Sequence, residues 1–444
     1  MTDKSVSPEG LVRGIRKWDL VAVAINAIIG AGIFGLPSRV YALIGTYSLI
    51  AFVACALVVM LIILCFAEVG SRFDETGGPY TYARAAFGPT LGFEVGWLTW
   101  LVRLFAFAAN CNLMVSYLGV FWAGATTPIA RVAIICLIVI LLAALNFIGV
   151  RQAALAADVF TIGKLVPLLI FIAVGLFFLR PGAYRFGSLP STSAFSQSVL
   201  LLIYPFTGFE MATIPAGEIR DPRRNLPLAL LLATVVVAIV YILIQVVCVG
   251  TLPQLASSTK PIADASQSFM GQAGASVIAA GAAVSIVGNL NILMLSGARL
   301  PFAFAEQQEL PKFIGSIHQR FLTPHVSIAI TAGLMLALTL KTSFVSAVTI
   351  SVIARLTAYA VTCAALPVLR RRKNVSPAMF KVRGGPVIAG GALVLAAWLL
   401  ANNLITDLRA GKVWWAIEAI QAAFAAAVGL IIYFGYRLYR RLAS

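Results

Sequence analysis

Charged residues are scarce in this sequence, and acidic residues are the scarcest. Asp, Glu, Lys and Arg together make up 11% of the 444 residues, whereas hydrophobic residues make up 61%. An ordinary soluble domain is about 25% charged and about half apolar. The composition therefore excludes a soluble globular protein and predicts an all-α membrane protein whose apolar helices cross the bilayer repeatedly.

Groups for metal binding and catalysis are also few. The chain has 2 histidines, which flank one predicted loop, and its 6 cysteines include no Cys-x-x-Cys pair. An intramembrane enzyme would need a nucleophile or paired acids within its helices, and no acid pair occurs there at helical spacing. We expect no enzymatic activity, no cofactor and no metal, and we interpret the cysteines as small packing residues.

Basic residues outnumber acidic ones by 33 to 16, which gives a net charge of +17. In a soluble protein this excess would suggest nucleic acid binding. Most of these residues, however, fall in loops and tails that a twelve-helix topology with both termini inside places in the cytoplasm, as the positive-inside rule requires. We expect a multi-pass protein of the cell inner (plasma) membrane that contacts the lipid bilayer and no nucleic acid.

The most informative stretch is residues 29–37, Ile-Gly-Ala-Gly-Ile-Phe-Gly-Leu-Pro, within an apolar run over residues 18–44. The run can cross a bilayer, which takes about 20 helical residues, yet its glycines weaken the helix. Open backbone at membrane depth is tolerated only against protein or a water-filled cavity. We interpret the stretch as a broken helix that binds a small zwitterion through free amides and free carbonyls.

A second apolar helix, which begins near Ser193, is interrupted by Pro205 and Gly208. Pro205 lacks an amide donor, and Gly208 loosens the same turn. The two interrupted helices are five helices apart and so run in opposite directions, which points to inverted repeats that share a site at mid-membrane. The alternative is that the glycines only permit close helix packing.

The pattern predicts one transmembrane domain over residues 1–444, with inverted repeats at about 18–180 and 193–370 and extra helices at about 386–440. Residues 71–87 are polar and rich in turn residues, so we expect a cytoplasmic loop there. The predicted helices cover about residues 18–44, 46–70, 88–122, 128–149, 153–179, 193 onward, 226–249, 273–305, 324–340, 344–369, 386–405 and 413–439.

Several short motifs occur in order along the chain and resemble those of the amino acid–polyamine–organocation superfamily of amino acid transporters. They are Gly-Ala-Gly-Ile-Phe-Gly at 30–35, Glu-Val-Gly-Ser-Arg at 68–72, Gly-Gly-Pro-Tyr at 77–80, Phe-Thr-Gly-Phe-Glu at 206–210 and the run at 218–227. The resemblance implies the fold of the bacterial leucine transporter: twelve transmembrane helices in a 5+5 inverted repeat with broken helices 1 and 6, plus two extra C-terminal helices.

The resemblance also implies a substrate site. The carboxylate of an amino acid would lie on the amides of residues 31–33, and its ammonium group on carbonyls near 26–28 and 206–208. Groups around two phenylalanines of the second break and on helices 3, 8 and 10 would select the side chain. The residues assigned in this way are Ile28, Ala31, Gly32, Ile33, Phe206, Thr207, Gly208 and Phe209.

Lys164 lies inside the fifth predicted helix. An intramembrane charge costs about 2.5–3.5 kcal/mol on insertion scales and therefore points to a function. In the superfamily that the chain resembles, such a lysine lies where sodium-driven members bind sodium, which implies sodium-independent transport. Loss of a proton from Lys164 would couple transport to pH. Alternatively, the lysine would be a permanently charged structural group bonded to the carbonyls of helix 1. Proton coupling and exchange without net proton movement both stay open.

Two further polar helix faces are candidates for the substrate path. Asn110 shares a face with Arg103, and Asn289 shares one with Ser285. We expect Asn110 and Asn289 to contact the substrate side chain, with polar contacts between helices as the alternative. For Arg103, and for Arg355 on the tenth predicted helix, we favour a structural role.

Two acids and one aromatic residue have expected roles in gating. Glu210 ends the second break, where we expect it to tether the unwound segment rather than bind a cationic substrate. Glu68 is expected in cytoplasmic salt bridges that form and break during alternating access. Phe206 is expected to act as an aromatic gate.

These observations predict a secondary active transporter that moves amino acids across the cytoplasmic membrane by alternating access. We expect sodium-independent, proton-coupled symport of neutral amino acids, because no unpaired acid beyond Glu210 marks a cationic site. An amino acid exchanger is one alternative, and a cationic amino acid or polyamine transporter is the other. No dimer signature is visible, so we expect a monomer.

Overall fold

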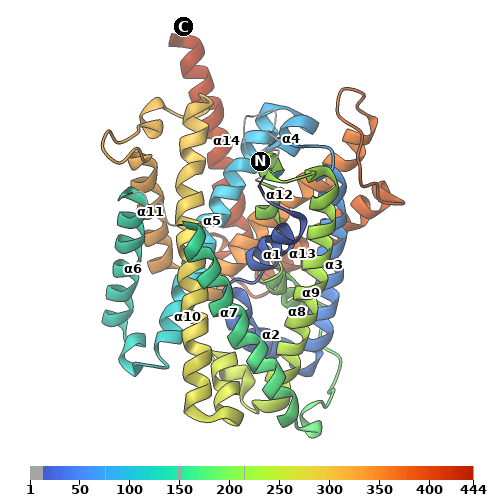
Figure 1. Cartoon of the computed structure of the whole chain (residues 1–444), viewed down its shortest axis with the longest axis vertical. Coiled ribbons are helices and arrows are strands. Elements are labelled where there is room, and N and C mark those ends of the chain that lie inside the picture. Colours follow the sequence, from blue (N-terminus) through green and yellow to red (C-terminus); the bar gives the residue numbers. More distant parts are fainter. Residues whose placement is uncertain (1–13, 76, 149–152, 215, 444) are drawn as a thin grey trace, which may run out of the picture.

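The computed structural model describes residues 14–75, 77–148, 153–214 and 216–443, without the side chains of 153–162 and 443. Apart from one bridge between Ile15 and Ile219, these parts of the chain form helices and loops (Figure 1). Eight apolar stretches are long enough to cross a bilayer. The protein is therefore an all-helical membrane protein, as its composition predicts.

The helices follow the apolar segments of the sequence closely. Their bounds are α1 Lys17–Ile28, α2 Gly32–Ile44, α3 Ser48–Gly70, α4 Pro79–Phe87, α5 Pro89–Leu118, α6 Pro128–Ile148, α7 Ala153–Gly175, α8 Thr192–Ile203, α9 Pro222–Thr251, α10 Pro261–Glu306, α11 His325–Lys341, α12 Phe344–Arg371, α13 Gly385–Arg409 and α14 Glu418–Ala443.

Three details differ from the sequence-based expectation. The predicted loop 71–87 contains α4, which begins at Pro79, because proline is favoured in the first turn of a helix. Helix α10 begins well before residue 273 and is kinked at Gly271, whose φ is 67°. Beyond the second break the described residues form two short 3₁₀ helices, Phe209–Thr213 and Ala216–Glu218, in place of a long continuation of α8.

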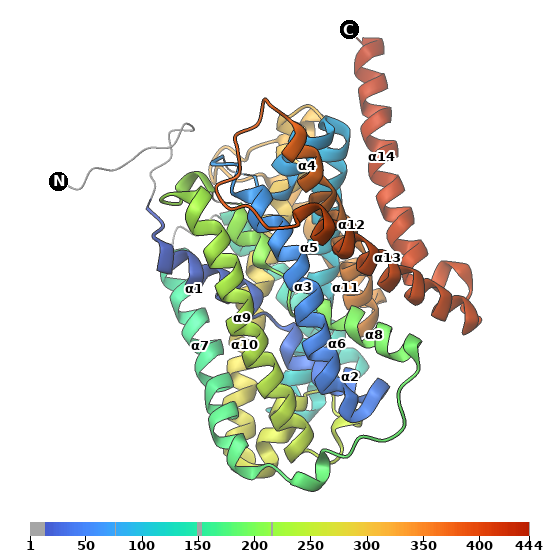
Figure 2. The same cartoon turned by 90° about the vertical axis from the view of Figure 1, so that its right-hand side faces the viewer.

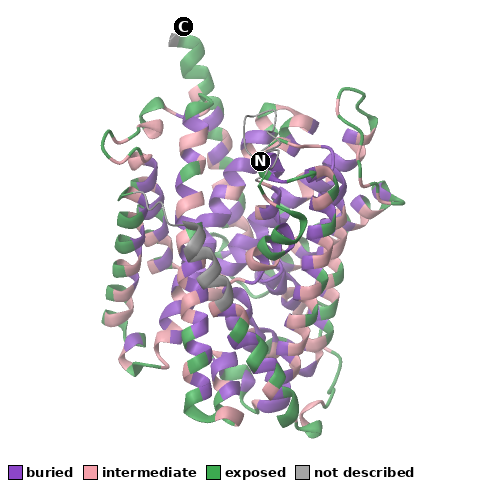
Figure 3. Ribbon diagram, in the orientation of Figure 1, coloured by how far each residue is buried: buried purple, intermediate pink, exposed green. Residues whose placement is uncertain are grey.

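Burial divides the helices into central and peripheral ones. Helix α5 is buried along most of its length and packs against α10 and α12. Peripheral helices such as α6 are largely exposed (Figure 3), and their exposed residues include Ile129, Leu137 and Ile140. These apolar side chains face the bilayer in a membrane protein. Helix α14 extends away from the main body (Figure 2).

The two helix breaks lie against each other in the centre of the bundle. A Cβ atom added to Gly32 would lie 2.8 Å from the ring of Tyr204 and 3.1 Å from Pro205. A Cβ atom added to Gly208 would lie 2.2 Å from the carbonyl oxygen of Ala27, and Gly208 has a φ of 113°. Each break therefore needs a glycine because the other break occupies the space of a side chain.

We expect Gly208→Ala to destabilise the protein by more than ~1 kcal/mol, because both the positive φ and the contact with Ala27 oppose a side chain. The matched control is Gly333→Ala in α11, where an added Cβ meets nothing within 4 Å. Thermal unfolding of the purified protein in detergent measures both changes. Equal unfolding temperatures for the two variants would contradict the close contact.

Candidate functional site

A cavity of about 300 Å³ lies where the two breaks meet. It is lined by the end of α1, the start of α2, the segment after α8, and residues of α5, α7, α10 and α12. Its volume lies at the lower end of the ~300–1,000 Å³ typical of small-molecule pockets. The cavity therefore suits a solute no larger than a single amino acid.

The first break presents backbone amides to this cavity. Helix α2 begins at Gly32, and residues 28–32 line the cavity. The first amides of a helix have no acceptor within the helix, and its dipole is positive at this end. The side-chain amide of Asn289 lies beside Gly30, since an added Cβ there would be 2.9 Å from its Nδ2 atom. This end of the cavity can bind a carboxylate.

Lys164 occupies the opposite pole of the same break. Its ammonium group donates to the carbonyl oxygens of Asn26 at 2.5 Å and Ile29 at 2.7 Å. These carbonyls belong to the C-terminal end of α1, where the helix dipole is negative. Lys164 is buried and lines the cavity, so a group that can carry a positive charge lies beside this space.

Tyr241 of α9 joins the two breaks. Its hydroxyl group lies within hydrogen-bonding distance of the carbonyl oxygens of Ile28, at 3.2 Å, and Pro205, at 3.1 Å. Protein donors thus already contact several of the carbonyls that helix opening frees. The ammonium group of a substrate would share these carbonyls or use neighbouring ones.

Glu210 holds the second break. Its Oε2 atom accepts from the amide of Gly208 at 2.9 Å and from the hydroxyl of Tyr359 at 2.5 Å. Its Oε1 atom lies 3.3 Å from Nη1 of Arg355. The carboxylate of Glu210 therefore has three partners, and these contacts hold the unwound segment in place.

Arg103 of α5 interacts electrostatically with Glu210 and Arg355, but its polar contact is with another residue. Its Nη2 atom contacts the sulfur of Met211 at 2.6 Å, and its Nε atom has no hydrogen-bond partner within the described structure. Arg103 and Arg355 line the cavity between the breaks and also a second cavity of about 310 Å³. Glu210 lines the second cavity but not the first. The second cavity extends toward Tyr80 of α4.

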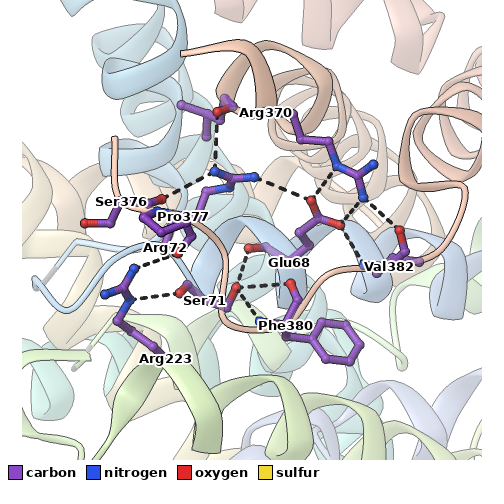
Figure 4. A network of polar contacts seen from close by, with 10 residues as sticks. Glu68, Ser71, Arg72, Arg223, Arg370, Ser376, Pro377, Phe380 and Val382 are labelled. Atoms are coloured by element: carbon purple, nitrogen blue, oxygen red, sulfur yellow. Dashed lines mark hydrogen bonds and ion pairs between the residues drawn. The ribbon is translucent and has the colours of Figure 1, made fainter. Parts of the chain in front are cut away.

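A separate polar network joins α3, α9 and α12 with the loop that follows α12 (Figure 4). Glu68 is fully buried and accepts from Nε and Nη2 of Arg370 at 2.7 and 2.6 Å, and from the amide of Val382 at 2.9 Å. Arg223 donates to the carbonyl oxygens of Ser71 and Pro377. The network fixes these elements at one end of the bundle.

Of the eleven residues predicted to bind the substrate or to couple its transport, seven line the cavity and four do not. The lining residues are Ile28, Ala31, Gly32, Lys164, Thr207, Gly208 and Asn289. The others lie behind this layer. Asn110 accepts from the hydroxyl of Tyr204, Ile33 is buried, the Phe206 ring packs on Tyr241, and the Phe209 ring packs on Phe66 and Tyr359.

Sequence reasoning missed some functional neighbours. Tyr204 and Met211 line the cavity without having been singled out, and Arg103 and Arg355 line it although a structural role was favoured for them. Helical spacing already placed Arg103 on the face of Asn110. For Arg103, the available signal was therefore the helix face that it shares with Asn110. The residue type alone did not indicate that it lines the cavity.

Comparison with known proteins gives matches over nearly the whole chain. A family model described as amino acid permease matches residues 15–428. Among individual proteins of Bacillus subtilis (strain 168), the branched-chain amino acid permease BcaP is 26% identical over 96% of this chain and 94% of its own length. The serine/threonine exchanger SteT is 27% identical over 90% and 92%, and the methylthioribose transporter 24% identical over 96% and 94%.

We expect Glu210→Gln to lower the stability of the protein by about 3–5 kcal/mol, because it leaves Arg355 buried without its acid. The control is Glu418→Gln, whose partner Lys412 is 39% exposed and whose loss should cost less than ~1 kcal/mol. Thermal unfolding in detergent compares the two.

The double variant Glu210→Gln/Arg355→Gln tests the pairing directly. Because both charges are removed together, it should recover part of the stability that Glu210→Gln loses. A double variant less stable than the single one would rule out this pair as the cause.

Proposed function

The chain belongs to the amino acid permease family, and from this premise we propose that it is a secondary transporter that carries amino acids across the cell inner (plasma) membrane by alternating access. The observation that supports this most directly is the cavity between two helix breaks, with helix amides at one pole and carbonyls at the other. An amino acid has the complementary pair of charges, a carboxylate and an ammonium group.

The proposal includes twelve membrane crossings and a 5+5 inverted repeat with two extra helices. It counts α1 with α2, and α8 with the 3₁₀ helix after the break, as one interrupted crossing each. The shorter apolar helices, such as His325–Lys341, would complete the set. Helix α4, the loop after α12 and the end of α14 lie at one end of the bundle (Figure 1). We assign this end, with both termini, to the cytoplasm because of its basic residues.

Two polar layers would act as gates between the substrate cavity and the cytoplasm. The first is the Arg355–Glu210 pair, which separates the substrate cavity from the second cavity. The second is the Glu68–Arg370 network at the ends of α3 and α12. Alternating access would require these contacts to rearrange, since each joins elements that are far apart in the chain.

Sodium-independent transport is supported by the position of Lys164. Its ammonium group takes the two backbone carbonyls at the end of α1 that a bound cation would need. The same contacts suit a proton carrier and a fixed structural cation. We propose proton symport, with amino acid exchange as the alternative.

The commitment of Glu210 to Gly208, Tyr359 and Arg355 supports a substrate without a cationic side chain. It leaves no described acid in the cavity for a polyamine or a cationic amino acid. Two of the relatives are named for branched-chain amino acids and for serine and threonine, none of which has a cationic side chain.

Uptake of a panel of labelled amino acids into sodium-free proteoliposomes tests this function. We expect accumulation with an inward proton gradient alone, because Lys164 would take the place of sodium in coupling. Uptake only into vesicles preloaded with unlabelled amino acid would instead identify an exchanger. Failure to transport any amino acid in either mode would overturn the proposal.

We expect Lys164→Ala to abolish the pH dependence of uptake, because it removes the only described ammonium group in the cavity. The matched control is Lys341→Ala at the exposed end of α11, which should leave the pH profile unchanged. A Lys164→Ala variant with normal rate and unchanged pH dependence would remove this residue from the coupling mechanism.

A further inference from the structure

The charges around the substrate cavity are unbalanced. Arg103, Lys164 and Arg355, each from a different helix, line it, and no Asp or Glu does so within the described part of the chain. Glu210, the acid that contacts Arg355, borders the second cavity and not this one. The described lining of this cavity therefore contains three basic side chains and no acidic one.

Two of the three cations have oxygen partners within the protein. Lys164 donates to two backbone carbonyls and holds the end of α1. Arg355 lies 3.3 Å from Glu210 and so shares the acid that tethers the second break. Both charges therefore have a role in keeping the two breaks open.

Arg103 is the cation that remains. It is 4% exposed, none of the ion pairs of the described residues includes it, and its Nε atom has no hydrogen-bond partner. Glu210 acts on the charge of Arg103 only from beyond ion-pair distance, and a buried charge without a direct acid partner is costly and is retained mainly where function uses it. The thioether of Met211 is a weak acceptor and does not offset the charge.

A neutral amino acid would leave this imbalance unchanged. Its carboxylate would lie at the start of α2 and its ammonium group at the carbonyls of the break, which adds no net charge. A second carboxylate on the side chain would offer Arg103 a bidentate partner, and Arg–carboxylate pairs are among the strongest polar contacts in proteins.

We infer that the transporter selects amino acids whose side chain carries a carboxylate, aspartate or glutamate, and that Arg103 binds this second carboxylate. The inference rests on the proposed amino acid transport and specifies the side chain as an acidic one, in place of the neutral one expected from the sequence. Arg103 and the amides of residues 30–32 line the same cavity, so both carboxylates of one molecule have a partner there.

The test is uptake of labelled glutamate and aspartate, beside glutamine and asparagine, into proteoliposomes that contain the full chain. The amides have nearly the same shape but lack the charge. We expect the acids to be preferred at least tenfold. We also expect glutarate, which lacks the amine, to compete poorly, because it leaves the carbonyl pole without an ammonium group.

Variants at Arg103 separate binding from folding. Arg103→Gln should lower glutamate uptake at least tenfold and leave glutamine uptake equal or higher, whereas Arg103→Lys should restore part of the glutamate uptake. The matched control is Arg299→Gln on α10, an exposed arginine that donates to the carbonyl oxygen of Leu295 in its own helix and should change neither rate.

Several outcomes would overturn the inference. If neutral amino acids were transported and the acids neither entered nor competed, the acidic substrate would be wrong while amino acid transport would stand. If glutarate competed as well as glutamate, the site would be one for dicarboxylates. If no amino acid were transported, the proposed function itself would fail. The preference of the wild-type protein decides the question even if Arg103→Gln does not fold.

Discussion

Backbone groups freed inside a membrane need partners, and this requirement shapes the centre of the protein. Two helices are interrupted where they meet, and water is not available to satisfy every exposed amide and carbonyl. Lys164, Tyr241 and Glu210 supply most of the missing partners, each from a different element. The residues of both breaks also line the cavity, so backbone groups that the protein does not bond itself are available there to the proposed substrate.

The same contacts determine the charge of the site. Holding the end of α1 takes a cation, Lys164, and holding the second break takes an acid, Glu210, which in turn is stabilised by Arg355 and Tyr359. These buried charges are therefore consequences of opening two helices. Arg103 is different because its contact with the second break is the weakly accepting sulfur of Met211 and no ion pair of the described residues includes it, so a ligand carboxylate could still pair with it.

The sequence predicted the helix breaks well because their cause is local. Glycine and proline change the backbone where they occur, so the first break and the interruption near Pro205 could be placed to within a few residues. Partners were not predictable, because they come from distant segments. Arg370 lies 302 residues from Glu68, and Lys164 lies 138 residues from Asn26. The packing of the Phe206 ring on Tyr241 could likewise not be predicted from a helix pattern, because Tyr241 belongs to another helix.

This difference explains why counting acids in the sequence favoured a neutral substrate while the structure favours an acidic one. An intramembrane arginine is ambiguous in a sequence, because backbone carbonyls and acids can both compensate it. The ambiguity is reduced once each cation of the cavity lining is matched with its partner. Arg103 of α5 is then the one that no ion pair of the described residues includes. A residue in that position can change the charge of the preferred substrate without disturbing the broken helices. If Arg103 binds the substrate side chain as inferred, substrate choice and the opening of the backbone are carried by separate residues of one cavity.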